Sequence, residues 1–105
     1  MLIYFSPKEK VEILPDAKLN TPYSTIVNFS DQRTYPEDLV FKISPANSGL
    51  SIKSVDEDMY DTVIISGTPK VKQDVLIEIF YVIMGSVGFF ESHEQKKYYQ
   101  IRVKE

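Results

Sequence analysis

The sequence has no cysteine, which excludes disulfide bonds, thiolate metal sites and cysteine nucleophiles. It has a single histidine, His93, so any Ser-His-Asp triad would have to use that residue. His93 lies in a polar stretch without the glycines of a nucleophile elbow. One histidine without cysteines also does not supply the ligands of a zinc site. We therefore expect a protein that is not an enzyme and has neither a catalytic site nor a cofactor.

Basic clusters and long apolar runs are also missing. The net charge is −3, and basic residues are adjacent only at Lys96-Lys97 and not in a larger cluster, so we expect no nucleic-acid partner. No apolar run approaches the ~20 residues of a transmembrane helix. The opening Met1–Phe5 is too short for the apolar part of a signal peptide, and no basic segment precedes it. The lack of disulfides is compatible with the cytoplasm and with the bacterial envelope alike.

Apolar residues are present at every second position over much of the chain, which is typical of strands rather than helices. The longest such stretch runs from Val75 to Met84. Its β-branched and aromatic residues, without glycine or proline, favour a central strand. We expect one of its faces to enter the core: Val75, Ile77, Ile79, Tyr81 and Ile83.

Shorter segments alternate in the same way, with proline, glycine and asparagine between them: 11–14, 23–29, 39–43, 50–55, 62–65 and 98–104. This pattern predicts an all-β, immunoglobulin-like β-sandwich of about seven to eight antiparallel strands. A chain of 105 residues has room for one such core, so residues 1–105 form one domain, with residues 1–9 as an extra strand or arm. The expected core is Tyr23, Val27, Phe29, Phe41, Ile43, Leu50, Ile77, Ile79, Ile101 and Val103.

The segment Ile65–Pro69 reads Ile-Ser-Gly-Thr-Pro. Together with Leu14–Asp16, Asn20–Ser24 and Ser48–Ile52, it resembles bacterial Ig-like domains related to the dystroglycan-type cadherin-like family. The resemblance spans roughly residues 11 to 104 and implies a cadherin-like sandwich. We expect Gly67 to serve the backbone of a turn, because one glycine does not make a phosphate-binding loop.

Two features depart from that family. Its penultimate strand often ends in an aspartate that joins a calcium site, whereas this sequence has Val82–Ser86 there. Its members are usually tandem copies, whereas this chain has one. The acidic group Asp56, Glu57, Asp58 and Asp61 has no glycine and imperfect spacing for calcium, so we expect no metal site.

If Ile77 and Ile79 face the core, the alternating residues of the same strand face outward, with apolar residues among them. A free antiparallel sheet normally carries polar residues on its solvent face, and exposed apolar patches tend to mark interfaces. We therefore predict a partner-binding surface: Phe80, Val82, Met84, Phe89, Phe90 and Tyr98. Equally, the N-terminal segment or the hairpin from Met84 to Glu94 could fold back and cover this face within the domain.

We interpret the chain as a non-catalytic domain that recognises a protein partner, or a second copy of itself, through this sheet face and the Met84–Glu94 hairpin. The family resemblance favours a bacterial envelope protein, such as a periplasmic lipoprotein ectodomain without its leader and anchor. A passive spacer or adhesion module of a larger surface protein is one alternative. A carbohydrate-binding module is another, and it would use Tyr98 and Phe80 as stacking aromatics.

Overall fold

Strands make up nearly all the regular structure of the protein. The computed structural model describes residues 10–55, 58–83 and 94–105. Within these ranges the only helix is one 3₁₀ turn, η1 (Pro36–Asp38). The strands are β1 (Val11–Ile13), β2 (Ala17–Lys18), β3 (Tyr23–Asn28), β4 (Val40–Ser44), β5 (Leu50–Ser54), β6 (Thr62–Gly67), β7 (Val75–Val82), β8 (Glu94–Ile101) and β9 (Val103–Lys104).

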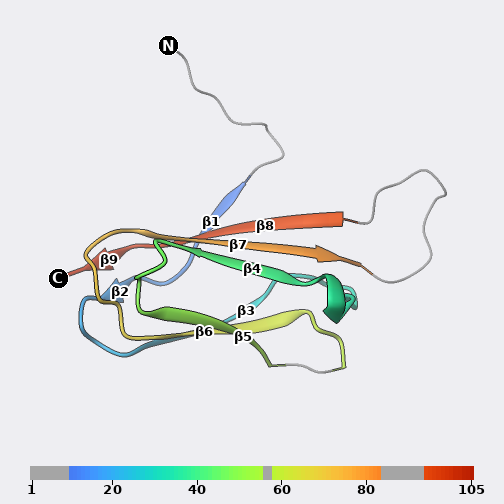
Figure 1. Cartoon of the computed structure of the whole chain (residues 1–105), viewed down its shortest axis with the longest axis horizontal. Helices are drawn as coiled ribbons and strands as arrows, with labels where there is room; N and C mark the ends of the chain where they lie inside the picture. The colour runs from blue at the N-terminus through green and yellow to red at the C-terminus, as the bar shows by residue number, and fades with distance from the viewer. Residues whose placement is uncertain (1–9, 56–57, 84–93) are drawn as a thin grey trace, which may run out of the picture.

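The strands form two layers that face each other (Figure 1). One sheet has the order β1-β8-β7-β4 and the other the order β3-β6-β5, while β2 and β9 form a short separate pair. With β3 to β8 taken as strands B to G, these are the neighbours found in an immunoglobulin sandwich. The predicted fold class is therefore confirmed.

Two strand pairs differ from the prediction, because β1 pairs with β8 and β2 pairs with β9 in parallel. The sandwich thus has nine strands in the described part of the chain and is not wholly antiparallel. Pro15 lies between β1 and β2 and has no amide hydrogen to donate, which accounts for the break between them.

The core lies between the two sheets and follows the predicted alternation. Along β7 the odd-numbered residues are buried and the intervening ones are at least partly exposed. Tyr81 packs edge-on against Phe29 of the facing layer, with ring centroids 4.9 Å apart. Its hydroxyl donates a 3.2 Å hydrogen bond to the Phe29 carbonyl. All residues of the predicted core are buried or pack against the buried cluster, and so is the predicted inward face of 75–83. The structure adds Ala17, Val63, Ile65 and Tyr99.

At the Ser-Gly-Thr-Pro element, the backbone around Gly67 lies very close to the backbone around Gly49. Gly67, at the end of β6, has a φ of 137°, and a Cβ there would lie 2.2 Å from the carbonyl oxygen of Gly49. Gly49 has a φ of 90°, and a Cβ there would meet the Thr68 carbonyl oxygen at 2.2 Å. The Thr68 amide donates to the Gly49 carbonyl at 3.2 Å. Only glycine fits at both positions without strain. The predicted backbone role of Gly67 is confirmed.

The hairpin boundaries differ from the predicted ones. β7 ends at Val82 rather than Met84, and β8 begins at Glu94, four residues before the predicted segment 98–104. Val82 pairs with Glu94 and Tyr81 with Gln95, so the antiparallel ladder extends further than expected. The polar residues Glu94 and Gln95 gave no strand pattern, but cross-strand hydrogen bonding does not require apolar side chains.

Candidate functional site

Apolar side chains take up seven of the thirteen outward positions on the sheet β1-β8-β7-β4, and the other six are Lys42, Ser44, Glu78, Glu94, Lys96 and Gln100. Val40 of β4 pairs with Phe80 of β7 and is 47% exposed, and Leu76 of β7 is 36% exposed. At the opposite edge of the sheet, Val11 and Ile13 of β1 are 46% and 50% exposed. We call the following outward set the apolar face: Val11, Ile13, Val40, Leu76, Phe80, Val82 and Tyr98.

The outward face of the other sheet provides a comparison. Its outward side chains are mainly polar: Ser24, Asn28, Ser51, Lys53, Thr62 and Ser66, with Ile26 and Ile64 among them. Ile26 is 67% exposed, but its neighbours along β3 are Ser24 and Asn28. A mixed, mostly polar face is usual for a solvated antiparallel sheet. The apolar face is therefore a property of one side of the sandwich only.

The predicted site residues divide into two groups. Phe80, Val82 and Tyr98 lie on the apolar face, as the alternation predicted. Met84, Phe89 and Phe90, like His93, lie outside the described residues.

The centre of the apolar face carries two lysines beside an aromatic ring. The ammonium groups of Lys42 and Lys96 lie 5.8 Å and 6.0 Å from the centre of the Phe80 ring, within reach of a cation–π attraction. Lys42 is also the cross-strand partner of Glu78. The face is thus an apolar surface with charges of both signs set into it. Neither lysine was predicted as a site residue, because their position around Phe80 depends on a cross-strand register that the sequence does not show.

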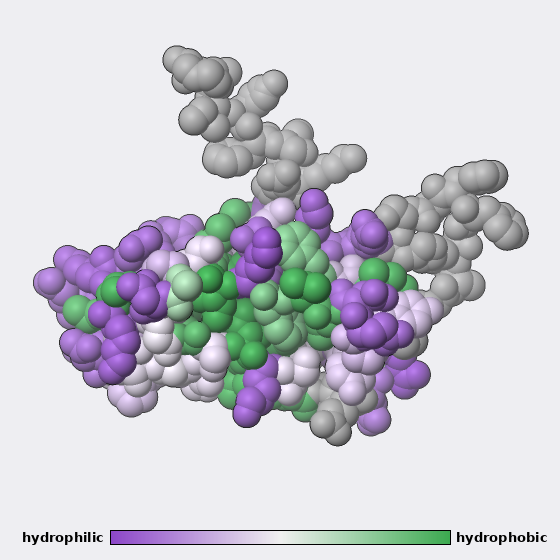
Figure 2. Space-filling model, viewed as in Figure 1, coloured by the Kyte–Doolittle hydropathy of each residue, from purple (hydrophilic) through white to green (hydrophobic). Residues whose placement is uncertain are grey.

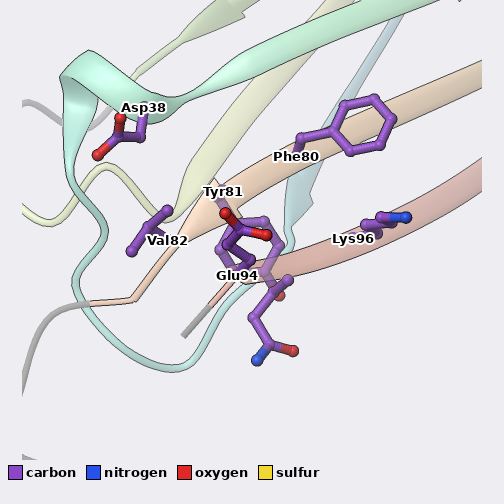
Figure 3. Close-up of a pocket in the computed structure, with 7 residues that line it drawn as sticks. Asp38, Phe80, Tyr81, Val82, Glu94 and Lys96 are labelled. Carbon is purple, nitrogen blue, oxygen red and sulfur yellow. The ribbon is translucent and has the colours of Figure 1, made fainter. Parts of the chain in front are cut away.

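One end of the apolar face is hollowed. The hollow measures about 270 Å³ and is lined by Asp38, Phe80, Tyr81, Val82, Glu94, Gln95 and Lys96. Figure 3 shows Asp38 reaching it from the turn before β4, with Glu94 and Lys96 on the strand beside Phe80. Its volume lies below the roughly 300–1,000 Å³ of typical small-molecule sites.

A second hollow, of about 380 Å³, is lined by Asn28, Phe29, Ser30, Asp31, Tyr81, Gln95 and Lys97. Burial, and then the charge of Asp31, raises the pKa of Tyr81, which keeps its phenol protonated. The Ser30 hydroxyl donates to the Gln32 carbonyl at 2.7 Å and accepts from the Gln32 amide, so it closes a turn. The Ser30 hydroxyl is thus engaged within its own turn.

The acidic group Asp56, Glu57, Asp58 and Asp61 lies only partly within the described residues. The Asp61 carboxylate accepts a 3.0 Å hydrogen bond from the Thr62 hydroxyl, and the backbone carbonyl of Asp61 accepts one from the side-chain amide of Asn28. Asp56 and Glu57 lie outside the described ranges. Within those ranges, no three acidic or histidine side chains come together as a metal site would require. No helix in the described part of the chain is long and apolar enough to cross a membrane.

Apolar surface is also exposed along the open side of the sandwich. In Figure 2 apolar surface gathers between β4 and β5, the edge strands of the two sheets. Phe41 and Ile43 of β4, with Leu50 and Ile52 of β5, are half-buried there and pack against the core. Phe41, Ile43 and Leu50 were predicted as core and Ile52 was not, and packing against the core explains why all four are apolar.

No protein-family model and no curated protein matches the sequence. Among solved structures, the chain is similar to an endo-fucoidan hydrolase, MfFcnA4, from glycoside hydrolase family 107, with a TM-score of 0.57 and 14% identity. That match covers 90% of this chain and 12% of the hydrolase. A histidine-to-glutamine variant of that enzyme matches with a TM-score of 0.55 and 15% identity, over 89% of this chain and 12% of that one. At these identities the likeness shows the fold alone.

Proposed function

We propose that this chain is a non-catalytic protein-binding domain that docks a partner on its apolar face. The observation that supports this proposal is the difference between the two outer faces of the sandwich, since seven of thirteen outward positions are apolar on one face and two of eight on the other. A passive spacer has no use for an apolar outer face and would be expected to cover it within the domain. Val40 and Leu76 are more than a third exposed, while the two segments that could cover the face, residues 1–9 and the Met84–Glu94 hairpin, lie almost wholly outside the described residues.

The side chains of the face suit protein recognition. Aromatic anchors usually dominate the energy of an interface, and aliphatic neighbours exclude water around them. Here Phe80 and Tyr98 supply the aromatic rings, and Val40, Leu76 and Val82 surround them. The resemblance of Ile65–Pro69 to bacterial Ig-like domains supports an envelope protein as the setting.

Binding of a carbohydrate is the second candidate. It is favoured by the fold shared with part of a glycoside hydrolase and by the aromatic pair Phe80 and Tyr98 on neighbouring strands. Sugars stack on flat aromatic rings, whereas branched aliphatic side chains such as Val40 and Leu76 add little to such a site. The aliphatic share of the apolar face therefore favours a protein.

The proposal is tested with Leu76→Lys and with Ile26→Lys as the matched control. Both are exposed strand positions, but they lie on opposite faces of the sandwich. The tagged wild-type chain and both variants are used to retain proteins from an extract of the parent cells. A partner should be retained by the wild type and by Ile26→Lys, and its affinity should fall at least tenfold for Leu76→Lys.

Two results would contradict the proposal. Equal retention of every protein by all three chains would show that the apolar face takes no part in docking. Retardation of the chain in a polysaccharide-containing gel, lost in Tyr98→Ala and kept in Leu76→Lys, would support the carbohydrate-binding function instead.

A further inference from the structure

We infer that the partner on the apolar face is a second copy of this chain, packed face to face about a twofold axis. This inference rests on the proposed function of that face and names its occupant. Three properties of the face support a second copy as its partner: its balanced charges, their register across the sheet, and its small area.

The charges on the face are balanced. Lys42 and Lys96 are the basic residues among its outward side chains, and Glu78 and Glu94 of the same sheet are acidic. The chain as a whole has a net charge of −3. A locally balanced mixture gives no attraction to a strongly basic or strongly acidic partner. A second copy presents the same mixture, and a twofold interface requires a surface that is complementary to itself.

The pairing register places these residues in rows across the sheet. One row holds Lys42, Glu78 and Tyr98, and the next holds Val40, Phe80 and Lys96. Consider a twofold axis that lies in the plane of the face and runs across the strands, between these two rows. Rotation about this axis places the first row of one copy over the second row of the other copy, on the same strand. Tyr98 then lies over Lys96 of the second copy, where a cation–π attraction is available.

The same operation brings opposite charges together. Glu78 lies over Phe80 of the second copy, and Lys96 of that copy is one strand away from this Phe80. Because of the symmetry, the attraction between Glu78 and Lys96 occurs twice in the dimer. Leu76 comes over Val82 of the second copy, which buries aliphatic surface at both ends of the interface. Sheets that pack in this aligned way rotate by about 30°, which displaces the neighbouring strands by less than one row.

Other ways of joining two copies are disfavoured by the same charges. A twofold axis along β7 would place Glu78 directly over itself. Pairing of two β4 edges about their centre would place Lys42 opposite Lys42, since Lys42 is the middle residue of that strand. Like charges directly opposite destabilise a strand pair, and a lysine on an edge strand protects against such pairing.

The area of the apolar face indicates how tightly two copies should bind. Four strands ~4.8 Å apart and four rows ~6.8 Å apart span a projected area of roughly 500 Å². Stable interfaces bury about 800 Å² of accessible surface on each partner, and weak ones less. Even allowing for the roughness of side chains, the face lies at the lower end of that range. The dimer should therefore be reversible and depend on concentration.

The inference is tested by sedimentation of the whole chain over a range of concentrations. The wild type and Ile26→Lys should show the same monomer–dimer equilibrium, and Leu76→Lys should raise the dissociation constant at least tenfold. Melting temperatures of the three chains, measured at a dilution where all are monomeric, verify that each remains folded.

An exchange of charges tests the register. Glu78→Lys and Lys96→Glu should each weaken the homodimer, because each brings like charges together across the axis. An equimolar mixture should restore the dimer, because one copy is then positive at both positions and the other negative at both. Rescue by mixing occurs only between copies, so improved folding of one chain does not account for it.

Three results would overturn the inference. A wild type that stays monomeric at the highest soluble concentration would exclude the second copy, while binding of a different protein that is lost in Leu76→Lys would still uphold the proposed function. A dimer unaffected by Leu76→Lys would use another surface. A mixture of Glu78→Lys with Lys96→Glu that stays monomeric would refute the register.

Discussion

Replacing Ile79 by alanine should destabilise the protein by about 2–5 kcal/mol, whereas the same change at Ile26 should cost less than about 1 kcal/mol. Both residues are isoleucines on strands. Ile79 lies on the central strand β7, points between the sheets and is 0% exposed. Ile26 lies on the edge strand β3, points outward and is 67% exposed.

The magnitudes follow from these exposures. The change to alanine removes three carbon groups, and burial of each is worth about 0.8 kcal/mol, which gives about 2.4 kcal/mol for Ile79. A cavity then adds about 24 cal/mol for each Å³ that the surroundings do not fill. Neighbours on β4 and β8 hold Ile79 from both sides, so the cavity should collapse only in part. For Ile26 only about a third of the transfer energy applies, or about 0.8 kcal/mol.

Urea unfolding followed by circular dichroism measures both free energies on the same scale. A change below about 0.5 kcal/mol at Ile79 would mean that the faces of β7 are reversed, since a buried branched side chain does not leave without cost. Equal losses at Ile79 and Ile26 would also refute the assignment. In either case Leu76, Phe80 and Val82 would belong to the core, and the apolar face would lose its basis.

Two further predictions concern the interior. Gly67→Ala should lower stability by at least about 2 kcal/mol in thermal unfolding, because its φ of 137° and the nearby Gly49 carbonyl leave no room for a Cβ; an unchanged melting temperature would contradict this close approach. Burial, followed by the charge of Glu12 and then Tyr81, raises the pKa of Tyr99 to about 12. The folded state therefore retains the phenol proton more strongly than the unfolded state, so this contribution to stability is fully present below about pH 10 and falls by roughly 2 kcal/mol as the pH rises to about 12. Urea titrations across this range should show a smaller alkaline loss for Tyr99→Phe than for the wild type.

The fold could be predicted because burial on one face imposes a period of two on a strand. Val75, Ile77 and Ile79 alternate with partly exposed residues for that reason, and the same signal placed the outward position of Phe80 and Val82. The signal fails where a strand has no apolar side chains to bury. Glu94 and Gln95 are part of the ladder with β7 but carry polar side chains, so their sequence resembled a turn.

The arrangement of the candidate site was harder to predict. Lys42 and Lys96 are far apart in the sequence, and only the register of β4 and β8 on β7 brings both to Phe80. Register depends on strand order and on the exact length of each connection, and alternation within one strand carries neither. For the same reason, the sequence did not indicate that β1 pairs in parallel with β8 or that Val11 contributes to the apolar face.

The part of the sequence that most strongly resembles a family is also the part with the most complete structural explanation. Gly67 of the Ser-Gly-Thr-Pro element and Gly49 of the Ser-Gly-Leu element touch each other, and neither tolerates a Cβ. Any sandwich that brings these two backbones together would need the same glycines. The motif therefore reports how the chain folds and carries no information about what it binds. By contrast, the polarity of an outward sheet face is not required by the fold, since the opposite face of this sandwich is mostly polar. Side chains that the fold does not need, such as Val40 and Leu76, are where function should be sought.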